Sequence, residues 1–244
     1  MQSILVTGAA SGVGKTTLIT RILNQLPGWG AVKLTVTKEE DVCQVVTDPS
    51  IIKQTGKDTA LFSEAGASLV VWIKASASLV ETALEKTLPL LAGLPGVVWE
   101  GNSLLSYLKF RVVVFVTDGR REIKPSAQLA LQKADFILLN QQKDKSCWFK
   151  ENSFPFFFLN LQDRDSQEWL NFWQEVQQKM GGAEKLELEE KIKAEVLKAL
   201  DENGKLSCEK AHQIADSLGV DRKIFGDVLN KLKIKLNKCQ LGCF

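Results

Sequence analysis

The 244-residue sequence has one histidine, a small net charge and no long hydrophobic run, and each absence excludes something. A single histidine makes a Ser/His/Asp nucleophile set hard to build. The formal net charge of +2 indicates no particular partner through bulk electrostatics. The longest apolar runs are too short to span a bilayer, and the amino terminus lacks the pattern of a secretory signal. We therefore expect a protein with no membrane segment.

Cysteines are also scarce. There are five, an odd number, scattered along the chain. This usage argues against a disulfide scaffold and favours a reducing, cytoplasmic location. The composition, 45% hydrophobic and 25% charged, is typical of a globular protein with one large core or with a large and a small domain.

The stretch GAASGVGKTT at residues 8–17 carries the strongest functional signal. It follows an apolar run and precedes a helical pattern, and it matches the phosphate-loop motif G-x-x-x-x-G-K-[ST] except that Ala9 replaces the first glycine. Backbone N–H groups of such a loop wrap a phosphate, the lysine reaches the β- and γ-phosphates, and the hydroxyl binds Mg²⁺. A plain glycine turn does not account for this context. The predicted nucleotide-binding residues are Ala10, Ser11, Gly12, Val13, Gly14, Lys15, Thr16 and Thr17.

Apolar runs that alternate with helical patterns predict the fold of the first 160 residues. The runs are nearly continuous, as in strands covered on both faces, and strand–helix alternation gives a doubly wound, mostly parallel α/β sheet. Its ligand site belongs at the carboxyl ends of the strands. The predicted strands are 3–7, 31–37, 68–73, 96–100, 111–117, 135–140 and 154–160.

Two acids follow predicted strands and are candidates for the same site. Glu100 ends GVVWE and Asp118 follows RVVVFVT. Either carboxylate can complete a magnesium shell or orient an attacking water, in a catalytic role beside Lys15. Solvated loop acids are the alternative. We favour Glu100, because the following residues GNS are small and let a ligand come close.

Three stretches in order, GAASGVGKTTLITRIL, TGKDTALFSEAGAS and VVWEGNS, resemble the molybdopterin-guanine dinucleotide biosynthesis protein B family. The resemblance implies a P-loop protein that binds GTP with Mg²⁺, hydrolyses it slowly and forms a homodimer. It also implies an adaptor role beside a nucleotidyltransferase or a molybdoenzyme during assembly of the molybdopterin guanine dinucleotide cofactor.

The sequence departs from this family at two places. The histidines that usually follow the lysine after the second strand are absent, although Lys33 is retained. Asn140 ends a strand where a base-specifying motif would begin, but Lys143 replaces the aspartate of that motif, so ATP stays open as the nucleotide. In the GKD segment, Lys57 and Asp58 are either nucleotide contacts or the start of a helix capped by Asp58.

The composition changes near residue 180, where paired glycines and charges suit a linker. We predict a P-loop NTPase domain at 1–180 and a small all-α domain at 181–244, with helices spaced as in a helix-turn-helix unit. Three roles stay open for it: DNA binding, docking to a partner protein, and a zinc or iron–sulfur site. The metal ligands would be Cys208, His212, Cys239 and Cys243.

Two other functions compete with the adaptor role. The first is a nucleotide-gated DNA-binding regulator, with the loop as sensor and the helix-turn-helix unit as output. The second is an ATP-dependent small-molecule kinase or ligase, because VTGAASGVGKT also resembles the start of dethiobiotin synthetase. The GKD and EAGA segments argue against this second alternative.

Overall fold

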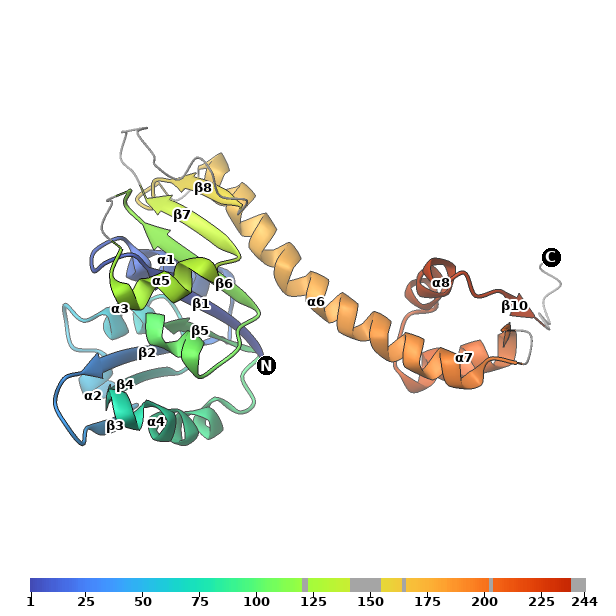
Figure 1. The fold of residues 1–244 in the computed structure, drawn as a ribbon, viewed down its shortest axis with the longest axis horizontal. Helices are drawn as coiled ribbons and strands as arrows, with labels where there is room; N and C mark the ends of the chain where they lie inside the picture. The colour runs from blue at the N-terminus through green and yellow to red at the C-terminus, as the bar shows by residue number, and fades with distance from the viewer. Residues whose placement is uncertain (120–122, 141–154, 164–165, 202–203, 238–244) are drawn as a thin grey trace. The chain divides into compact units, whose positions relative to one another are not determined.

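A computed structural model describes residues 1–119, 123–140, 155–163, 166–201 and 204–237, with backbone only for 182–187. Its main feature is an eight-stranded sheet in the order β3-β4-β2-β5-β1-β6-β7-β8 (Figure 1). Every pair of neighbours is parallel except β3 and β4. The strands are β1 Gln2–Gly8, β2 Gly30–Thr37, β3 Cys43–Val46, β4 Val70–Ser76, β5 Gly96–Glu100, β6 Val112–Thr117, β7 Phe136–Asn140 and β8 Phe156–Leu159.

The α/β class and the mostly parallel sheet confirm the prediction from the apolar runs. All seven predicted strands are present; six lie within two residues of their expected bounds, and β4 ends three residues beyond its expected end at 73. The strand that sequence reasoning missed is β3. It has only four residues, none of them fully buried, and it pairs antiparallel at the sheet edge. Such a strand needs no continuous apolar run.

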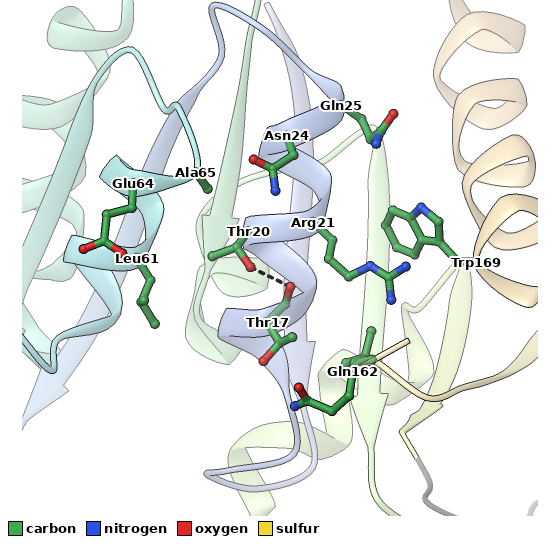
Figure 2. Close-up of a pocket in the computed structure, with 11 residues that line it drawn as sticks. Thr17, Thr20, Arg21, Asn24, Gln25, Leu61, Glu64, Ala65, Gln162 and Trp169 are labelled. Carbon is green, nitrogen blue, oxygen red and sulfur yellow. Dashed lines mark hydrogen bonds between the residues drawn. The ribbon is translucent and has the colours of Figure 1, made fainter. Parts of the chain in front are cut away.

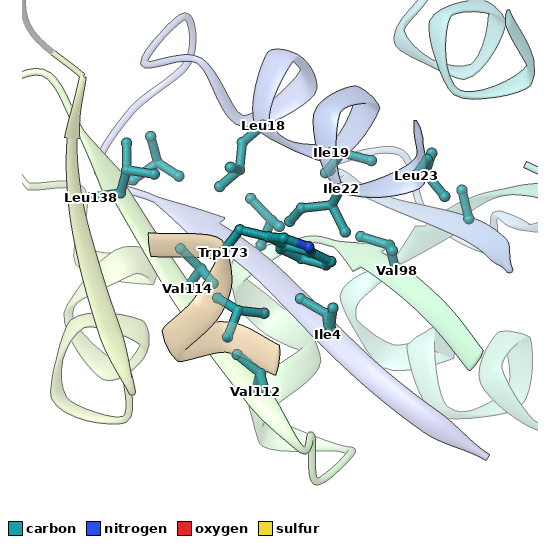
Figure 3. Packing of buried hydrophobic residues seen from close by; sticks show 14 of the residues in the cluster. Ile4, Leu18, Ile19, Ile22, Leu23, Val98, Val112, Val114, Leu138 and Trp173 are labelled. Carbon is teal, nitrogen blue, oxygen red and sulfur yellow. The ribbon is translucent and has the colours of Figure 1, made fainter. Parts of the chain in front are cut away.

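Helices cover both faces of the sheet, so two cores form. One core joins β1 side chains to α1, α3 and the first half of α6, including Trp173 of α6 (Figure 3). The other joins the opposite face to α4, η3 and α5. The helices of this part are α1 Lys15–Gln25, α2 Pro49–Ile52, α3 Asp58–Glu64, η1 Ala77–Leu79, α4 Val80–Thr87, η2 Leu88–Leu91, η3 Asn102–Ser106 and α5 Pro125–Gln132.

The chain forms two compact units, residues 1–180 and 181–244. The linker expected around the paired glycines is wrong, because helix α6, Gln167–Ala199, continues through them. Each glycine costs a helix only about 1 kcal/mol relative to alanine. The flanking Leu-, Glu- and Lys-rich sequence favours the helix and offsets this cost.

The second unit has a small core of its own, formed by α6 residues such as Ile192 and Val196 and by the elements that follow. These elements are β9 Leu206–Ser207, α7 Cys208–Ser217, α8 Arg222–Lys231 and β10 Leu236–Asn237. Side chains of Ser207 and Asp221 cap α7 and α8, as such residues commonly do. Because β9 and β10 pair in parallel, the all-α prediction is not confirmed.

No helix in the described part of the chain combines the length and the apolar character that a membrane crossing requires.

Candidate functional site

The loop between β1 and α1 takes a conformation that depends on glycine. Gly12 and Gly14 have φ values of 78° and 104°, in the region that favours glycine. A Cβ atom on Gly14 would lie 2.6 Å from Asn140 Nδ2 and 2.8 Å from Leu161 Cδ1. The loop therefore passes too close to its neighbours for any side chain at Gly14.

Two asparagines from distant segments hold the loop. The Asn102 amide accepts a hydrogen bond from the Gly8 N–H at 3.0 Å and donates one to the Gly8 carbonyl at 3.1 Å. The Asn140 amide donates to the Val13 carbonyl at 3.0 Å and accepts from the Leu161 N–H at 3.2 Å. These bonds give Asn140 a loop-positioning role, and its predicted contact with the nucleotide stays a prediction. Sequence reasoning missed Asn102, whose only signal was the small polar run after Glu100.

A lysine and two acids form a network beside the loop. Lys33 on β2 and Glu100 at the end of β5 are register partners, and Lys33 Nζ lies 3.1 Å from Glu100 Oε2. Lys33 also pairs with Asp58, whose other carboxylate oxygen accepts a hydrogen bond from the Thr16 hydroxyl at 2.9 Å. The network thus links Thr16, at the start of α1, to residues of β2, β5 and α3.

Asp58 reaches this network because of its place in α3. Lys57 occupies the N-cap position without a side-chain cap, and Asp58 is the first helical residue. The alternative in which Asp58 caps the helix is therefore wrong. The Lys57 ammonium lies 5.1 Å from the centroid of the Trp72 ring. Lys57, predicted as a nucleotide contact, thus contacts an aromatic ring on β4.

The network stabilises its charged forms. Burial alone would raise the pKa of Asp58, but the hydrogen bond and the charge of Lys33, together with the bond from Thr16, hold that pKa below its usual value. Burial alone would lower the pKa of Lys33, yet Glu100 and Asp58 outweigh it and raise that pKa. The Glu100 side chain is only 8% exposed, and a buried carboxylate is stable when it is paired in this way.

Lys15, the phosphate-loop lysine, lies in an unfavourable environment. Its ammonium donates to the Ala10 carbonyl at 3.1 Å. Burial is the main influence and lowers the pKa of Lys15; Glu100 and Asp58 oppose the shift, and Lys33 and Lys124 add to it. An anion bound at the loop would raise the pKa of Lys15 again, because a nearby negative charge favours the protonated amine.

A pocket of about 340 Å³ opens on the strand-end side of the loop, and we call it the lysine pocket. Three lysines and Glu100 provide its charges, while serine and threonine hydroxyls provide neutral hydrogen-bonding groups. Its lining comprises Gly8, Ala10, Ser11, Lys15, Lys33, Leu34, Thr35, Val36, Glu100, Gly101, Asn102, Ser103, Lys124 and Ser126. Asp118, the second predicted acid, is half-buried after β6 and is not among these lining residues.

A second pocket, of about 470 Å³, runs along α1 from Thr17 and is called the helix pocket (Figure 2). Its one arginine, Arg21, is held in place, with the guanidinium 4.0 Å from the Trp169 ring centroid and 2.8 Å from the Asp163 carbonyl. Amides and hydroxyls dominate the rest of the wall. The lining comprises Thr17, Thr20, Arg21, Asn24, Gln25, Leu61, Glu64, Ala65, Leu161, Gln162 and Trp169.

The predicted metal ligands of the second unit are only partly described. Cys208 and His212 both lie on α7, as their spacing predicted. Cys239 and Cys243 lie outside the described residues. Among the residues that the structure describes, no group of three or more His, Cys, Asp or Glu side chains is placed to hold a metal ion. The zinc or iron–sulfur site stays a prediction.

Comparison with known proteins adds no family assignment. No protein-family model matches the chain, and no curated protein sequence matches it. The resemblance to the molybdopterin-guanine dinucleotide biosynthesis protein B family stays a prediction from three short stretches.

Proposed function

We propose that this protein binds a nucleoside triphosphate with Mg²⁺ as a P-loop NTPase-type protein. The observation that carries the proposal is the bond between the Thr16 hydroxyl and Asp58, next to Lys15 and at the start of α1. A glycine turn without a ligand needs neither a half-buried lysine with a lowered pKa nor a hydroxyl–carboxylate pair beside it. Both are suited to a bound metal–phosphate group.

The donor set fits magnesium. Mg²⁺ prefers oxygen ligands, and Thr16 and Asp58 place a hydroxyl and a carboxylate oxygen 2.9 Å apart. When bound, the ion would neutralise charge on the β- and γ-phosphates. Asp58 and Glu100, the ligand expected from the sequence, both pair with Lys33, but the Thr16 hydroxyl donates its hydrogen bond to Asp58. We therefore assign Asp58 with Thr16 to the metal, and Glu100 to the placement of Lys33.

The two pockets suggest how the nucleotide lies. The loop amides and Lys15 would hold the phosphates, and Thr17 marks the side on which the helix pocket begins. The nucleoside would occupy the helix pocket, whose amides can donate and accept hydrogen bonds to a base. The γ-phosphate would then face the lysine pocket.

Hydrolysis by this site would be slow. A carboxylate that acts as a general base must lie within reach of the attacking water and be free to take a proton. Asp58 and Glu100 are both engaged by Lys33, so neither carboxylate is free to accept a proton from water. The arrangement supports binding and positioning better than rapid turnover.

The sequence resemblance supports a more specific role. It favours GTP as the nucleotide and an adaptor function, as a homodimer, beside a nucleotidyltransferase or a molybdoenzyme in molybdopterin guanine dinucleotide assembly. Amide side chains such as Asn24 and Gln162 suit either purine, since each carries both donors and acceptors. The nucleotide preference therefore has to be measured.

The first test is calorimetric titration with GTP and with ATP, each with Mg²⁺. We expect binding that Lys15→Ala weakens about a hundredfold, the upper range for a charge-assisted bond. Lys53→Ala is the matched control, because Lys53 is exposed and lines neither pocket. A GTP preference supports the cofactor-assembly role, and an ATP preference supports the kinase or ligase alternative. Absence of binding by both would contradict the proposed function.

The second test concerns the metal. Asp58→Asn should reduce the gain in affinity that Mg²⁺ provides by about tenfold or more, since a charged ligand is replaced by a neutral one. Binding in the presence of a chelator should change less. Asp227→Asn, at an exposed position on α8, is the control. If Mg²⁺ increases the nucleotide affinity of Asp58→Asn as much as that of the wild-type protein, Asp58 is not a metal ligand.

A further inference from the structure

The lysine pocket has walls well beyond the phosphate loop. They come from the end of β2 at Leu34–Val36, from Gly101–Ser103 after β5, and from the start of α5 at Lys124 and Ser126. Its volume of about 340 Å³ lies in the range of small-molecule sites.

The charges of the pocket are unevenly matched. Lys33 has two acidic partners, and Lys15 is the residue that the loop offers to phosphate. Lys124 is exposed and forms no ion pair within the described part of the chain. Its backbone N–H donates to the Ala9 carbonyl at 3.2 Å, which holds this residue beside the loop. Lys124 is therefore the cation that the nucleotide and the network leave available.

We infer that the lysine pocket binds a small anionic molecule beside the nucleoside triphosphate, with Lys124 contacting its carboxylate or phosphate group. This inference rests on the proposed function, which places the nucleoside in the helix pocket and leaves the lysine pocket to a second ligand. Hydroxyls of Thr35, Ser103 and Ser126 supply neutral hydrogen bonds to the rest of the molecule. A second ligand at this point is what a transferase requires.

The test separates the two ligands. A non-hydrolysable analogue of the preferred nucleotide is first titrated with Mg²⁺ by calorimetry. Succinate and glycerol 3-phosphate are then added to the loaded protein, and their binding is followed by saturation-transfer NMR. We expect at least one probe to bind the loaded protein, and to bind Lys124→Gln about tenfold more weakly or worse. Lys53→Gln should leave probe binding unchanged, and both variants should bind the analogue normally.

The outcomes are distinct. Binding of succinate identifies a carboxylate ligand, and binding of glycerol 3-phosphate identifies a phosphate ester. Failure of both probes to bind the loaded protein, or displacement of the analogue by either, would overturn the inference and leave the pocket to the γ-phosphate alone. A Lys124→Gln variant that loses analogue affinity without any change in probe binding would also overturn it. Failure of the wild-type protein to bind the analogue is the separate failure of the proposed function.

Discussion

The two pockets beside the P-loop differ in the chemistry of their walls. The lysine pocket gathers three lysines and a buried glutamate, whereas the helix pocket is lined mainly by amides and hydroxyls and holds its arginine against Trp169. The lysine pocket thus carries four charged side chains, whereas the helix pocket carries two, Arg21 and Glu64. The difference teaches that one loop can border a strongly charged wall on one side and a less charged wall on the other.

Consecutive residues create this separation. Thr16 bonds to Asp58 on one side, and Thr17 lines the helix pocket on the other. Successive residues of a helix point about 100° apart, so the first turn of α1 naturally serves two directions. Helix α3 is used in the same way, since it begins at Asp58 and contributes Leu61 and Glu64 to the helix pocket.

The largest effect should come from breaking the loop between the pockets. Gly14→Ala places a Cβ atom within 2.8 Å of Asn140 and Leu161 at a φ of 104°. We expect nucleotide affinity to fall about a hundredfold, because strain of this kind costs about 1–3 kcal/mol and the loop must shift. Calorimetry and thermal unfolding measure the two consequences.

The matched control for the loop is Gly12→Ala. Gly12 also has a positive φ, of 78°, but its Cβ atom would meet nothing within 4 Å. The loss should stay at about tenfold, the cost of the backbone conformation alone. Equal losses in the two variants would show that crowding by Asn140 and Leu161 has no role.

A smaller effect should follow from a change in the helix pocket. Gln162→Ala removes an exposed amide from its wall. We expect nucleotide affinity to fall about three- to tenfold, the range for one neutral hydrogen bond. Binding of inorganic triphosphate should not change, because it has no nucleoside. If triphosphate binding falls equally, the assignment of the two pockets to the two ends of the nucleotide is wrong.

The smallest effect concerns pH. The pKa of Asp58 lies below its usual value of about 3.9, so its contribution to stability is present above that pH and is lost as pH falls through the lowered pKa. The pKa of Lys33 is raised, so its contribution is lost only above about pH 10.4. Unfolding midpoints measured from neutral to acid pH should fall less steeply in Asp58→Asn. If the unfolding midpoints of the wild-type protein and of Asp58→Asn fall equally as the pH is lowered, Asp58 does not contribute to this pH dependence.

Much of the fold could be predicted because parallel strands covered on both faces leave continuous apolar runs. The glycine loop between β1 and α1 could be predicted because its sequence pattern lies within ten consecutive residues. The continuity of α6 could not, since the glycines near residue 181 favour a break that the flanking sequence overrides. The edge strand β3 has too little burial to leave a pattern.

The sequence by itself determined the loop, its lysine and threonine, and the strands that bring candidate acids to one edge of the sheet. Only the tertiary structure decided which acid meets Thr16, because Asp58 lies 42 residues away and nothing local distinguishes it from a helix cap. It likewise paired Lys33 with Glu100, 67 residues apart, through the register of β2 and β5. Local patterns follow from the spacing of side chains along one element, whereas a site at the strand ends depends on how distant elements pack.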